Sequence, residues 1–468
     1  MKKNILIILI FLISSSIQAQ QVNLKGIVKN VESKTIDVFK YTDMLSYSLE
    51  KIASGKIDTS GKFNFSFKIE ETIFTYIKIG TSQAPLYIEP NKTYNLKISC
   101  NDCNSINDKT NPYLDPKILE VIIENSDSTE LNNMVSKFNN DYDAFIYKNY
   151  ITLIKQRNKA KIDSFRVQVN KKYSIDKNSY FDALVRYRFA AIEQMAQLKS
   201  NLTFAKKYFL DQPVLYENTG YMEFFNNFFE SYIISVSPNI KAGDLNKTIN
   251  VLGSFPAFLD SLGKDTILKN EVLREMVAIK SLVKLFYSNQ YSPESIIHML
   301  QYLADNTKFP KHKIASENII TLLTKLIKGS VAPAFSLKDM NGQSYTLAEL
   351  NKDKYVYLIF WNTWCVPCIS DMELIDGLIK KYGTKITFIG ISCDKEFMTF
   401  YHFMQQNKKF NFTCLYWGND TKLLDDYNIK AFPTYFLIDP EGKIYQNPAE
   451  APSQYLDGLL KLITKEKK

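Results

Sequence analysis

The pattern of apolar and polar positions changes character twice along the 468-residue chain. Residues 22–100 contain short runs in which β-branched and aromatic residues alternate with polar ones, the period expected of strands with one buried face. The turn Thr59-Ser60-Gly61 before three alternating phenylalanines, Phe63, Phe65 and Phe67, predicts a hairpin. We therefore expect an N-terminal antiparallel β-sandwich with strands at Val22–Val28, Thr35–Tyr41, Lys62–Ile69, Thr75–Ile79, Leu86–Glu89 and Thr93–Ile98.

Beyond residue 112 the apolar residues recur every three or four positions instead, which is the spacing of helices that bury one face. This spacing is clear in three stretches, at 181–195, 272–286 and 319–327. Aromatic residues are also frequent there, as at Phe224, Phe225, Phe228 and Phe229. We interpret these stripes as hydrophobic core rather than as a ligand groove. The sequence therefore predicts an all-α middle region over residues 113–328, without indicating what that region does.

The segment Lys328-Gly329-Ser330 interrupts the helical pattern, and strands and helices alternate after it. Alternation of this kind predicts a parallel sheet covered by helices, here with a hairpin around Asp439-Pro440-Glu441-Gly442. The predicted strands are Tyr355–Trp361, Ile386–Ser392, Thr434–Ile438 and Lys443–Tyr445, and the predicted helices are Ile369–Tyr382, Glu396–Asn407, Lys422–Tyr427 and Ser453–Thr464. Residues 329–468 thus form a third domain, after a signal segment at 1–20, a β domain at 21–112 and the helical region at 113–328.

The first twenty residues have the layout of a secretory signal peptide. Met1-Lys2-Lys3 is basic, Asn4 to Ile13 is apolar, and Ser14 to Gln20 is small and polar, with Ala19 as the residue before cleavage. The apolar run is about half the ~20 residues that a membrane-spanning helix requires. An uncleaved anchor is the alternative, because Ile17 is larger than the residue preferred two positions before Ala19. We expect export to the periplasm or cell envelope and no transmembrane helix in the mature chain.

Composition and charge add little beyond a globular character. Apolar residues make up 45% of the chain and charged residues 23%, and the net charge is +9. Residues 330–468 contain 16 lysines and 16 acidic residues, so the positive surplus lies in residues 1–329. It is spread over single lysines rather than gathered in a patch. A solvated surface is therefore favoured over a nucleic-acid site.

Cys365-Val366-Pro367-Cys368 is the segment with the clearest chemistry. Two cysteines at this spacing serve either a zinc site or a redox pair, and Cys100 and Cys103 could supply a second zinc-binding pair. The motif follows a predicted strand and opens a predicted helix, where free N–H groups and the helix dipole favour a thiolate at Cys365. Pro367 is tolerated in the first turn because the N–H that it lacks would have no helical partner there. With Trp364 directly before the motif, we favour a redox-active disulfide in which Cys365 attacks and Cys368 resolves, without a metal or other cofactor.

Residues 330–468 closely resemble the TlpA/ResA branch of the thioredoxin superfamily. The matching stretches are Gly329 to Leu337, Phe360 to Cys368 and Ala431 to Asp439. The resemblance implies a thioredoxin fold and an exported thiol–disulfide oxidoreductase, a class in which several members act in cytochrome c maturation. Through Gly61-Lys62-Phe63 and Leu86-Tyr87-Ile88-Glu89-Pro90, the β region resembles a β domain of unknown function that often precedes thioredoxin-like domains in exported bacterial proteins.

The same resemblance assigns roles to residues around the cysteines. It implies that Pro433, after Phe432, is a cis-proline opposite the cysteines, beside which the backbone pairs with the bound partner chain. Asp371 falls where the family usually has Glu, and one turn from Cys368 it could handle that thiol's proton. The alternative for Asp371 is an exposed helix residue. Ile359 stands where cytosolic thioredoxins have a buried Asp.

The other candidate residues carry weaker signals. Cys393 and Cys414 are expected to be buried apolar residues rather than a second redox pair. Cys100-Asn101-Asp102-Cys103 lacks Trp and Pro, which favours a local disulfide or two idle thiols. His298, His312 and His402 form no ligand-spacing motif.

The leading functional hypothesis is an exported reductase of protein disulfides, supplied with electrons by an upstream thiol donor in the envelope. A thiol peroxidase is the first alternative, although Phe360–Trp364 lacks the Pro that such sites place ahead of the reactive Cys. The second is an envelope binding or scaffold protein with a secondary redox site. We expect protein thiols or disulfides as partners, and no nucleic acid.

Overall fold

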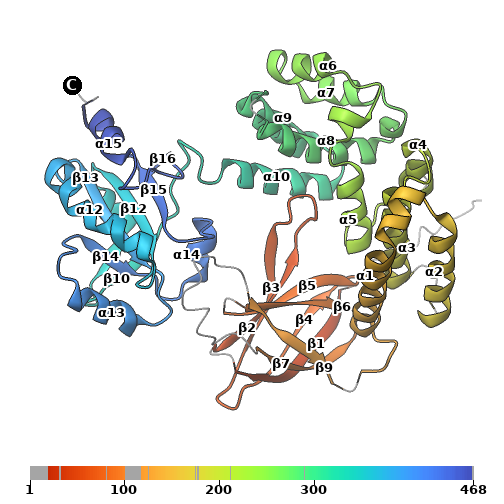
Figure 1. The fold of residues 1–468 in the computed structure, drawn as a ribbon, viewed down its shortest axis with the longest axis horizontal. Coiled ribbons are helices and arrows are strands. Elements are labelled where there is room, and N and C mark those ends of the chain that lie inside the picture. Colours follow the sequence, from red (N-terminus) through yellow and green to blue (C-terminus); the bar gives the residue numbers. More distant parts are fainter. Residues whose placement is uncertain are drawn as a thin grey trace, which may run out of the picture.

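The computed structural model describes residues 19–30, 33–80, 82–100, 117–124, 126–173, 175–176, 179–210, 212–288 and 290–465. Strands come first, helices follow, and a mixed sheet with helices closes the chain (Figure 1). The signal peptide predicted at residues 1–20 lies outside the described residues except for Ala19 and Gln20. Within the described ranges, no helix combines the length and the apolar character that crossing a membrane requires.

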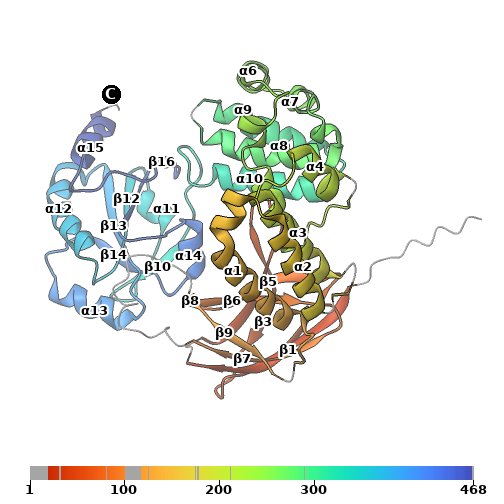
Figure 2. The same ribbon diagram turned by 45° about the vertical axis from the view of Figure 1, so that its right-hand side comes forward.

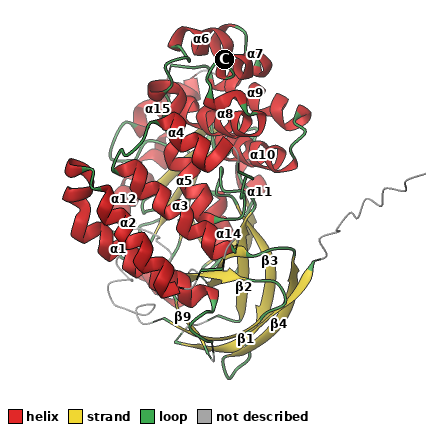
Figure 3. Ribbon diagram, turned by 90° about the vertical axis from the view of Figure 1, so that its right-hand side faces the viewer, coloured by secondary structure: helices red, strands yellow, loops and turns green. Residues whose placement is uncertain are grey.

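The N-terminal region consists of two sheets that share one buried core, with Val22 and Leu24 from one sheet against Ile36 and Val38 from the other. Figure 3 shows these strands, in yellow, curving beneath the helices. The four-stranded sheet has the order β4-β1-β7-β9, with β1 (Gln20–Lys29), β4 (Lys62–Ile69), β7 (Thr93–Ser99) and β9 (Glu120–Ile123). The five-stranded sheet has the order β3-β2-β5-β6-β8, with β2 (Thr35–Tyr41), β3 (Leu49–Lys56), β5 (Ile73–Ile79), β6 (Ser82–Ile88) and β8 (Lys117–Ile118).

Three details of this region differ from the expectation. The pairs β1–β7 and β6–β8 are parallel, so the region is not purely antiparallel. The turn at Thr59–Gly61 exists, with Gly61 at a φ of 81°, but it forms no hairpin because β3 pairs with β2 and β4 pairs with β1. The β region also continues past residue 112, since β8 and β9 add to the edges of the two sheets.

The helical region follows and buries the predicted stripes. The stretches at 181–195 and 272–286 form helices, and the stretch at 319–327 forms a helix as far as Thr324, where the helix ends. Phe224, Phe225, Phe228 and Phe229 are buried in the larger helical core, as predicted. The helices are α1 (Leu131–Gln156), α2 (Lys159–Tyr173), α3 (Tyr180–Met195), α4 (Asn201–Ala205), α5 (Thr219–Phe228), α6 (Ala242–Asn246), α7 (Phe255–Leu262), α8 (Glu271–Phe286), α9 (Pro293–Asn306) and α10 (Pro310–Thr324). Four short turns of other helix types lie at 206–210, 232–236, 247–251 and 267–269.

The β2–β3 loop joins the β region to the helices. Figure 1 shows the tip of this loop reaching between α5 and α10. Met44 in the loop is 5% exposed and belongs to the core of the helical region. The side-chain amide of Asn226 donates to the Met44 carbonyl oxygen and to the Tyr47 hydroxyl, each at 2.8 Å. The amide of Asn318 donates to Thr42 Oγ1 at 2.7 Å. The loop is therefore held by side-chain amides of the helical region, the buried one of Asn226 and the half-buried one of Asn318, as well as by apolar packing.

The C-terminal unit is a seven-stranded mixed sheet of order β11-β10-β14-β13-β12-β15-β16. The strands β12 and β13 are parallel and the terminal hairpin β15–β16 is antiparallel, as the sequence predicts. The strand β14, which runs parallel to β13, and the hairpin β10–β11 were not predicted. Helices α12 and α13 lie on one side of the sheet and α11 and α14 on the other (Figure 2). The elements are β10 (Ser336–Asp339), β11 (Ser344–Thr346), α11 (Leu347–Asn351), β12 (Tyr355–Trp361), α12 (Val366–Tyr382), β13 (Ile386–Ser392), α13 (Phe397–Gln406), β14 (Thr413–Tyr416), α14 (Thr421–Asp426), β15 (Thr434–Ile438), β16 (Ile444–Gln446) and α15 (Leu456–Lys465).

We predict that Asn226→Ala weakens the joint between the β and helical regions. Asn226 is 8% exposed, so its loss leaves the Met44 carbonyl without its amide donor, at a cost of roughly 1–3 kcal/mol. Urea unfolding followed by circular dichroism should show a lower midpoint than in the native chain. Asn140→Ala on the exposed face of α1 is the matched control. Equal midpoints for the two variants would show that the amide contributes nothing to the joint.

Candidate active site

The candidate site lies where β12 ends and α12 begins. β12 is buried from Val356 to Trp361 and pairs with β13 on one side and β15 on the other, so the end of this strand is held firmly. The chain then turns, with the Cys365 N–H donating to the Asn362 carbonyl oxygen at 3.1 Å. Cys365 becomes the residue that caps α12, and its Sγ accepts from the backbone N–H of Cys368 at 3.3 Å. Pro367 occupies the first turn, as the sequence predicts.

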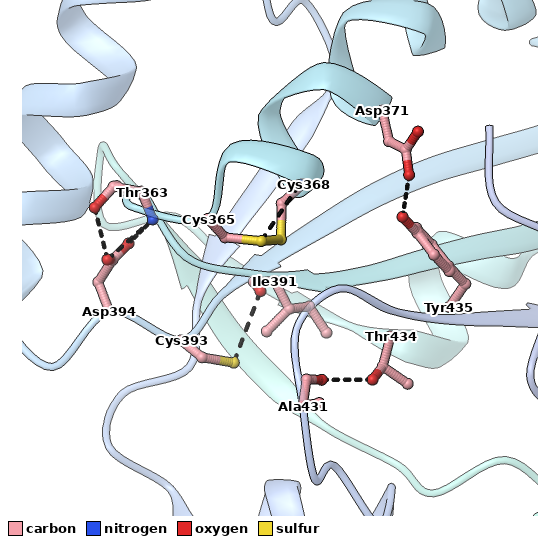
Figure 4. Close-up of a disulfide and its surroundings, with 10 residues drawn as sticks. All are labelled: Thr363, Cys365, Cys368, Asp371, Ile391, Cys393, Asp394, Ala431, Thr434 and Tyr435. Atoms are coloured by element: carbon pink, nitrogen blue, oxygen red, sulfur yellow. Dashed lines mark hydrogen bonds between the residues drawn. A yellow bond between two sulfur atoms is a disulfide. The ribbon is translucent and has the colours of Figure 1, made fainter. Parts of the chain in front are cut away.

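Cys365 and Cys368 form a disulfide, with their Cα atoms 5.2 Å apart (Figure 4). The spacing of one helical turn brings the two sulfur atoms together without any rearrangement of the helix. Cys365 is 3% exposed and Cys368 is fully buried, whereas Val366 between them is 73% exposed. The structure thus shows the oxidised form of the pair, with Cys365 nearer to the surface than Cys368.

The loop before β15 lies beside the cysteine motif. The Trp364 and Phe432 rings meet edge to face with centroids 6.4 Å apart. The peptide bond between Phe432 and Pro433 is cis. Thr434 follows, pairs with Phe360 of β12, and donates its hydroxyl to the Ala431 carbonyl oxygen at 2.6 Å. The structure therefore places Phe432, directly before the cis-Pro433, against Trp364, which precedes Cys365, although the two segments are distant in the sequence.

Asp371 lies one helical turn after Cys368, but it is not an exposed helix residue, which was one of the two expectations. It is 6% exposed and accepts a hydrogen bond from the Tyr435 hydroxyl (Figure 4). Burial, followed by the hydrogen bond to the Asp371 carboxylate, raises the pKa of Tyr435, so the phenol keeps its proton and acts as the donor. Ile359 of β12 pairs with Tyr435 in the sheet. Asp371 is thus a buried carboxylate supported by one phenol.

Asp394 is a second buried carboxylate, and it was not among the residues expected in the site. It follows the end of β13 and is 3% exposed. Its carboxylate accepts from the Thr363 backbone N–H at 3.1 Å, the Thr363 hydroxyl at 2.8 Å and the Ser392 hydroxyl at 2.7 Å. One pattern in the sequence could have indicated Asp394: polar residues directly follow two predicted buried strands. The carboxyl ends of neighbouring parallel strands meet at one edge of the sheet, so residues there lie close together.

Among the described residues, the two other cysteines of the C-terminal unit lack the features of a redox site. Cys393 and Cys414 are buried free thiols, as predicted. Burial raises the pKa of both, to about 12 for Cys414, and the Asp394 carboxylate contributes to the effect on Cys393. Cys100 is disulfide-bonded, and Cys103 lies outside the described residues.

The histidines and the acidic side chains are possible ligands of a metal ion. His312 is fully buried in the helical region, where it pairs with Glu275 at 2.9 Å. In the parts of the chain that the structure covers, no three or more His, Cys, Asp and Glu side chains gather in a way suited to a metal ion.

Comparison with known proteins gives matches to the C-terminal unit. A family model described as the AhpC/TSA family matches residues 328–447. Thiol-disulfide oxidoreductase ResA of Bacillus cereus is 34% identical over 143 residues, which is 30% of this chain and 80% of that protein. ResA of Bacillus subtilis is 34% identical over 118 residues, 25% of this chain and 64% of that protein. The thioredoxin domain of a thiol-disulfide oxidoreductase from Bacteroides vulgatus has a crystal structure with 27% identity and a TM-score of 0.27, covering 30% of this chain and 96% of that one.

We predict that Cys393 and Cys414 stay unmodified in the folded, reduced protein while Cys365 reacts. At pH 8 a thiol with a pKa of about 12 is ionised in only about one molecule in ten thousand, and only the thiolate is alkylated. Iodoacetamide treatment followed by peptide mass spectrometry should find the label on Cys365. Unfolding in urea is the control and should expose all the thiols. Labelling of Cys393 at a rate similar to Cys365 would contradict the prediction.

Proposed function

The chain belongs to the ResA-like thiol–disulfide oxidoreductases of the thioredoxin superfamily, and we propose that Cys365 and Cys368 carry out its reaction by a dithiol–disulfide cycle. The observation that supports this most strongly is the position of Cys365 at the N-terminus of α12, bonded to Cys368 one turn later. The N–H groups of a first helical turn favour an anion, so this position favours the thiolate that attacks a disulfide.

The proposed cycle reduces a partner disulfide by two electrons. The Cys365 thiolate attacks one partner sulfur, the partner S–S bond breaks, and the departing partner thiolate takes up a proton. Cys368 then loses its proton and attacks Cys365 of the mixed disulfide, which releases the second partner thiol and leaves Cys365–Cys368 oxidised. An upstream dithiol reduces the pair again by the same exchange in reverse.

Neighbouring residues support these steps. We propose that Trp364 and Phe432 shield the sulfur atoms, and that the backbone beside Pro433 pairs with the partner chain during the exchange. Asp371 accepts the proton of Cys368 as that thiol attacks, because it is a carboxylate held one helical turn away. Tyr435 orients Asp371 through its hydrogen bond.

The reductase is favoured over the alternatives for specific reasons. Peroxidase sites place Pro and Thr ahead of the reactive Cys, and Phe360–Trp364 contains Thr363 but no Pro. Both curated relatives described above are named thiol-disulfide oxidoreductases. A scaffold role for residues 21–328 is compatible with the reductase, and would be the main function only if the redox pair were dispensable.

We propose that the protein is exported and works in the periplasm or cell envelope. The leader-like residues 1–20 support this location. Its partners there are protein disulfides and an upstream thiol donor.

We predict that Cys368→Ser traps the mixed disulfide while Cys365→Ser abolishes the exchange. Without the resolving thiol, the bond between Cys365 and the partner persists, whereas without the attacking thiol it never forms. Non-reducing gels of a mixture with a disulfide-bonded protein such as insulin should show the adduct only for Cys368→Ser. Native chain that reduces no insulin in the presence of dithiothreitol, together with no adduct, would rule out the proposed cycle.

We predict that Asp371→Asn slows turnover by about tenfold or more, because an amide cannot take up the proton of Cys368 and general base catalysis typically contributes 10²–10⁴. Insulin reduction, measured as turnover at a fixed pH of 7, should show this loss. Asp376→Asn is the matched control, since Asp376 lies on the same helix with its side chain 47% exposed. Full activity of Asp371→Asn would remove Asp371 from the mechanism.

A further inference from the structure

The hydrogen bonds of Asp394 concentrate on the loop that carries Cys365. Thr363, two residues before Cys365, donates both its backbone N–H and its hydroxyl to the Asp394 carboxylate. Figure 4 shows the carboxylate pointing at Thr363, on the segment that continues to the disulfide. The backbone of Asp394 is fixed as well, because Trp417 Nε1 donates to its carbonyl oxygen at 2.8 Å. Asp394 therefore ties this loop to the end of β13 through its carboxylate and to Trp417, just after β14, through its carbonyl oxygen.

The donors around Asp394 suit a carboxylate in the charged form. Three neutral donors aim at its two oxygens, and a buried carboxylate with such donors retains its charge more readily than one without them. Burial nevertheless raises its pKa, while the hydrogen bonds from Ser392 and Thr363 act in the opposite direction. A buried negative charge is weakly screened, so it acts on other ionisable groups nearby.

We propose that Asp394 is a positioning residue for Cys365, and that its buried charge makes the Cys365–Cys368 pair more reducing. The proposal rests on the dithiol–disulfide cycle proposed above. The disulfide is uncharged, and only the reduced form carries a thiolate at Cys365. A negative charge beside the loop opposes that thiolate and therefore disfavours the reduced form. A pair whose reduced form is disfavoured gives up its electrons more readily.

Other ionisable groups around Asp394 contribute to the same local field. Cys393 precedes it, and its raised pKa keeps that thiol neutral. Tyr416 of β14 also has a raised pKa, through burial first and then through Asp394 and Glu396. Lys395 and Glu396 follow Asp394 with opposite charges and are exposed, so water screens both. Asp371 is the other buried carboxylate, on the side of Tyr435.

The Asp394→Asn variant removes the negative charge and keeps the hydrogen bonds. The amide oxygen can still accept from Thr363, and the amide nitrogen can donate to the Ser392 hydroxyl, which can turn round. Asp394→Glu does the reverse, because it keeps the charge but its longer side chain displaces the oxygens. Asp376→Asn is the matched control, an exposed carboxylate on the helix of the redox pair.

We expect Asp394→Asn to lower the pKa of Cys365 and to shift the equilibrium with glutathione at pH 8 about three- to tenfold toward the dithiol. A tenfold shift corresponds to ~30 mV in potential. The measurements are the pH dependence of Cys365 alkylation and mass spectrometry of the redox forms of the full chain. Asp394→Glu should lower thermal stability without this shift, and Asp376→Asn should change neither quantity.

The charge effect is overturned if Asp394→Asn folds, the pKa of Cys365 is the same as in the native chain, and the equilibrium constant with glutathione matches the native value within about twofold. If Asp394→Asn fails to fold, Asp394→Ser, also neutral, is measured in its place by the same criteria. These readouts do not depend on a partner protein. If the redox equilibrium of the Cys365–Cys368 pair shifts in Asp394→Asn but Cys368→Ser traps no partner, this inference stands and the proposed function fails.

Discussion

The junction between β12 and α12 is the constraint on which the site depends. A strand buried on both faces and paired on both edges cannot shift without breaking the sheet, so its last residue, Trp361, is fixed. Only four residues separate it from α12, and Cys365 is the last of them. The place of Cys365 at the head of a helix, with Cys368 in bonding range, therefore follows from the packing of the sheet rather than from contacts between the cysteines.

The rest of the chain is tied to this unit at the end of α10. Lys325 reaches the Asp425 carbonyl oxygen at 2.8 Å, and the side chain of Asn447 donates to the Leu326 carbonyl oxygen at 3.2 Å. Leu326 itself is 6% exposed and belongs to the core of the C-terminal unit. The chain thus enters the C-terminal unit through buried and hydrogen-bonded residues, and Figure 2 shows α10 leading toward it from the helical region.

The elements predicted best from the sequence are those whose own residues form a clear apolar pattern. Tyr355–Trp361 is a continuous apolar run, and its bounds match β12. β3 was missed because Leu49–Lys56 is exposed at most positions and lacks alternation. The cysteine pair could be inferred from its spacing and context, but the burial of Asp371 could not. It depends on Tyr435, which lies 64 residues away and meets Asp371 only after the sheet has formed.

The two buried carboxylates show that the Cys365–Cys368 motif does not by itself determine the chemistry of the site. Keeping a carboxylate out of water is costly unless donors compensate, and Asp371 and Asp394 receive theirs from different directions. Tyr435 donates a hydrogen bond to Asp371, and Thr363 donates to Asp394. In the proposal above, a thiolate at Cys365 is favoured by the N-terminus of α12 and opposed by the Asp394 carboxylate. Because these two effects have opposite signs, we propose that their balance, and not only the residues between the two cysteines, sets the reducing power of the pair.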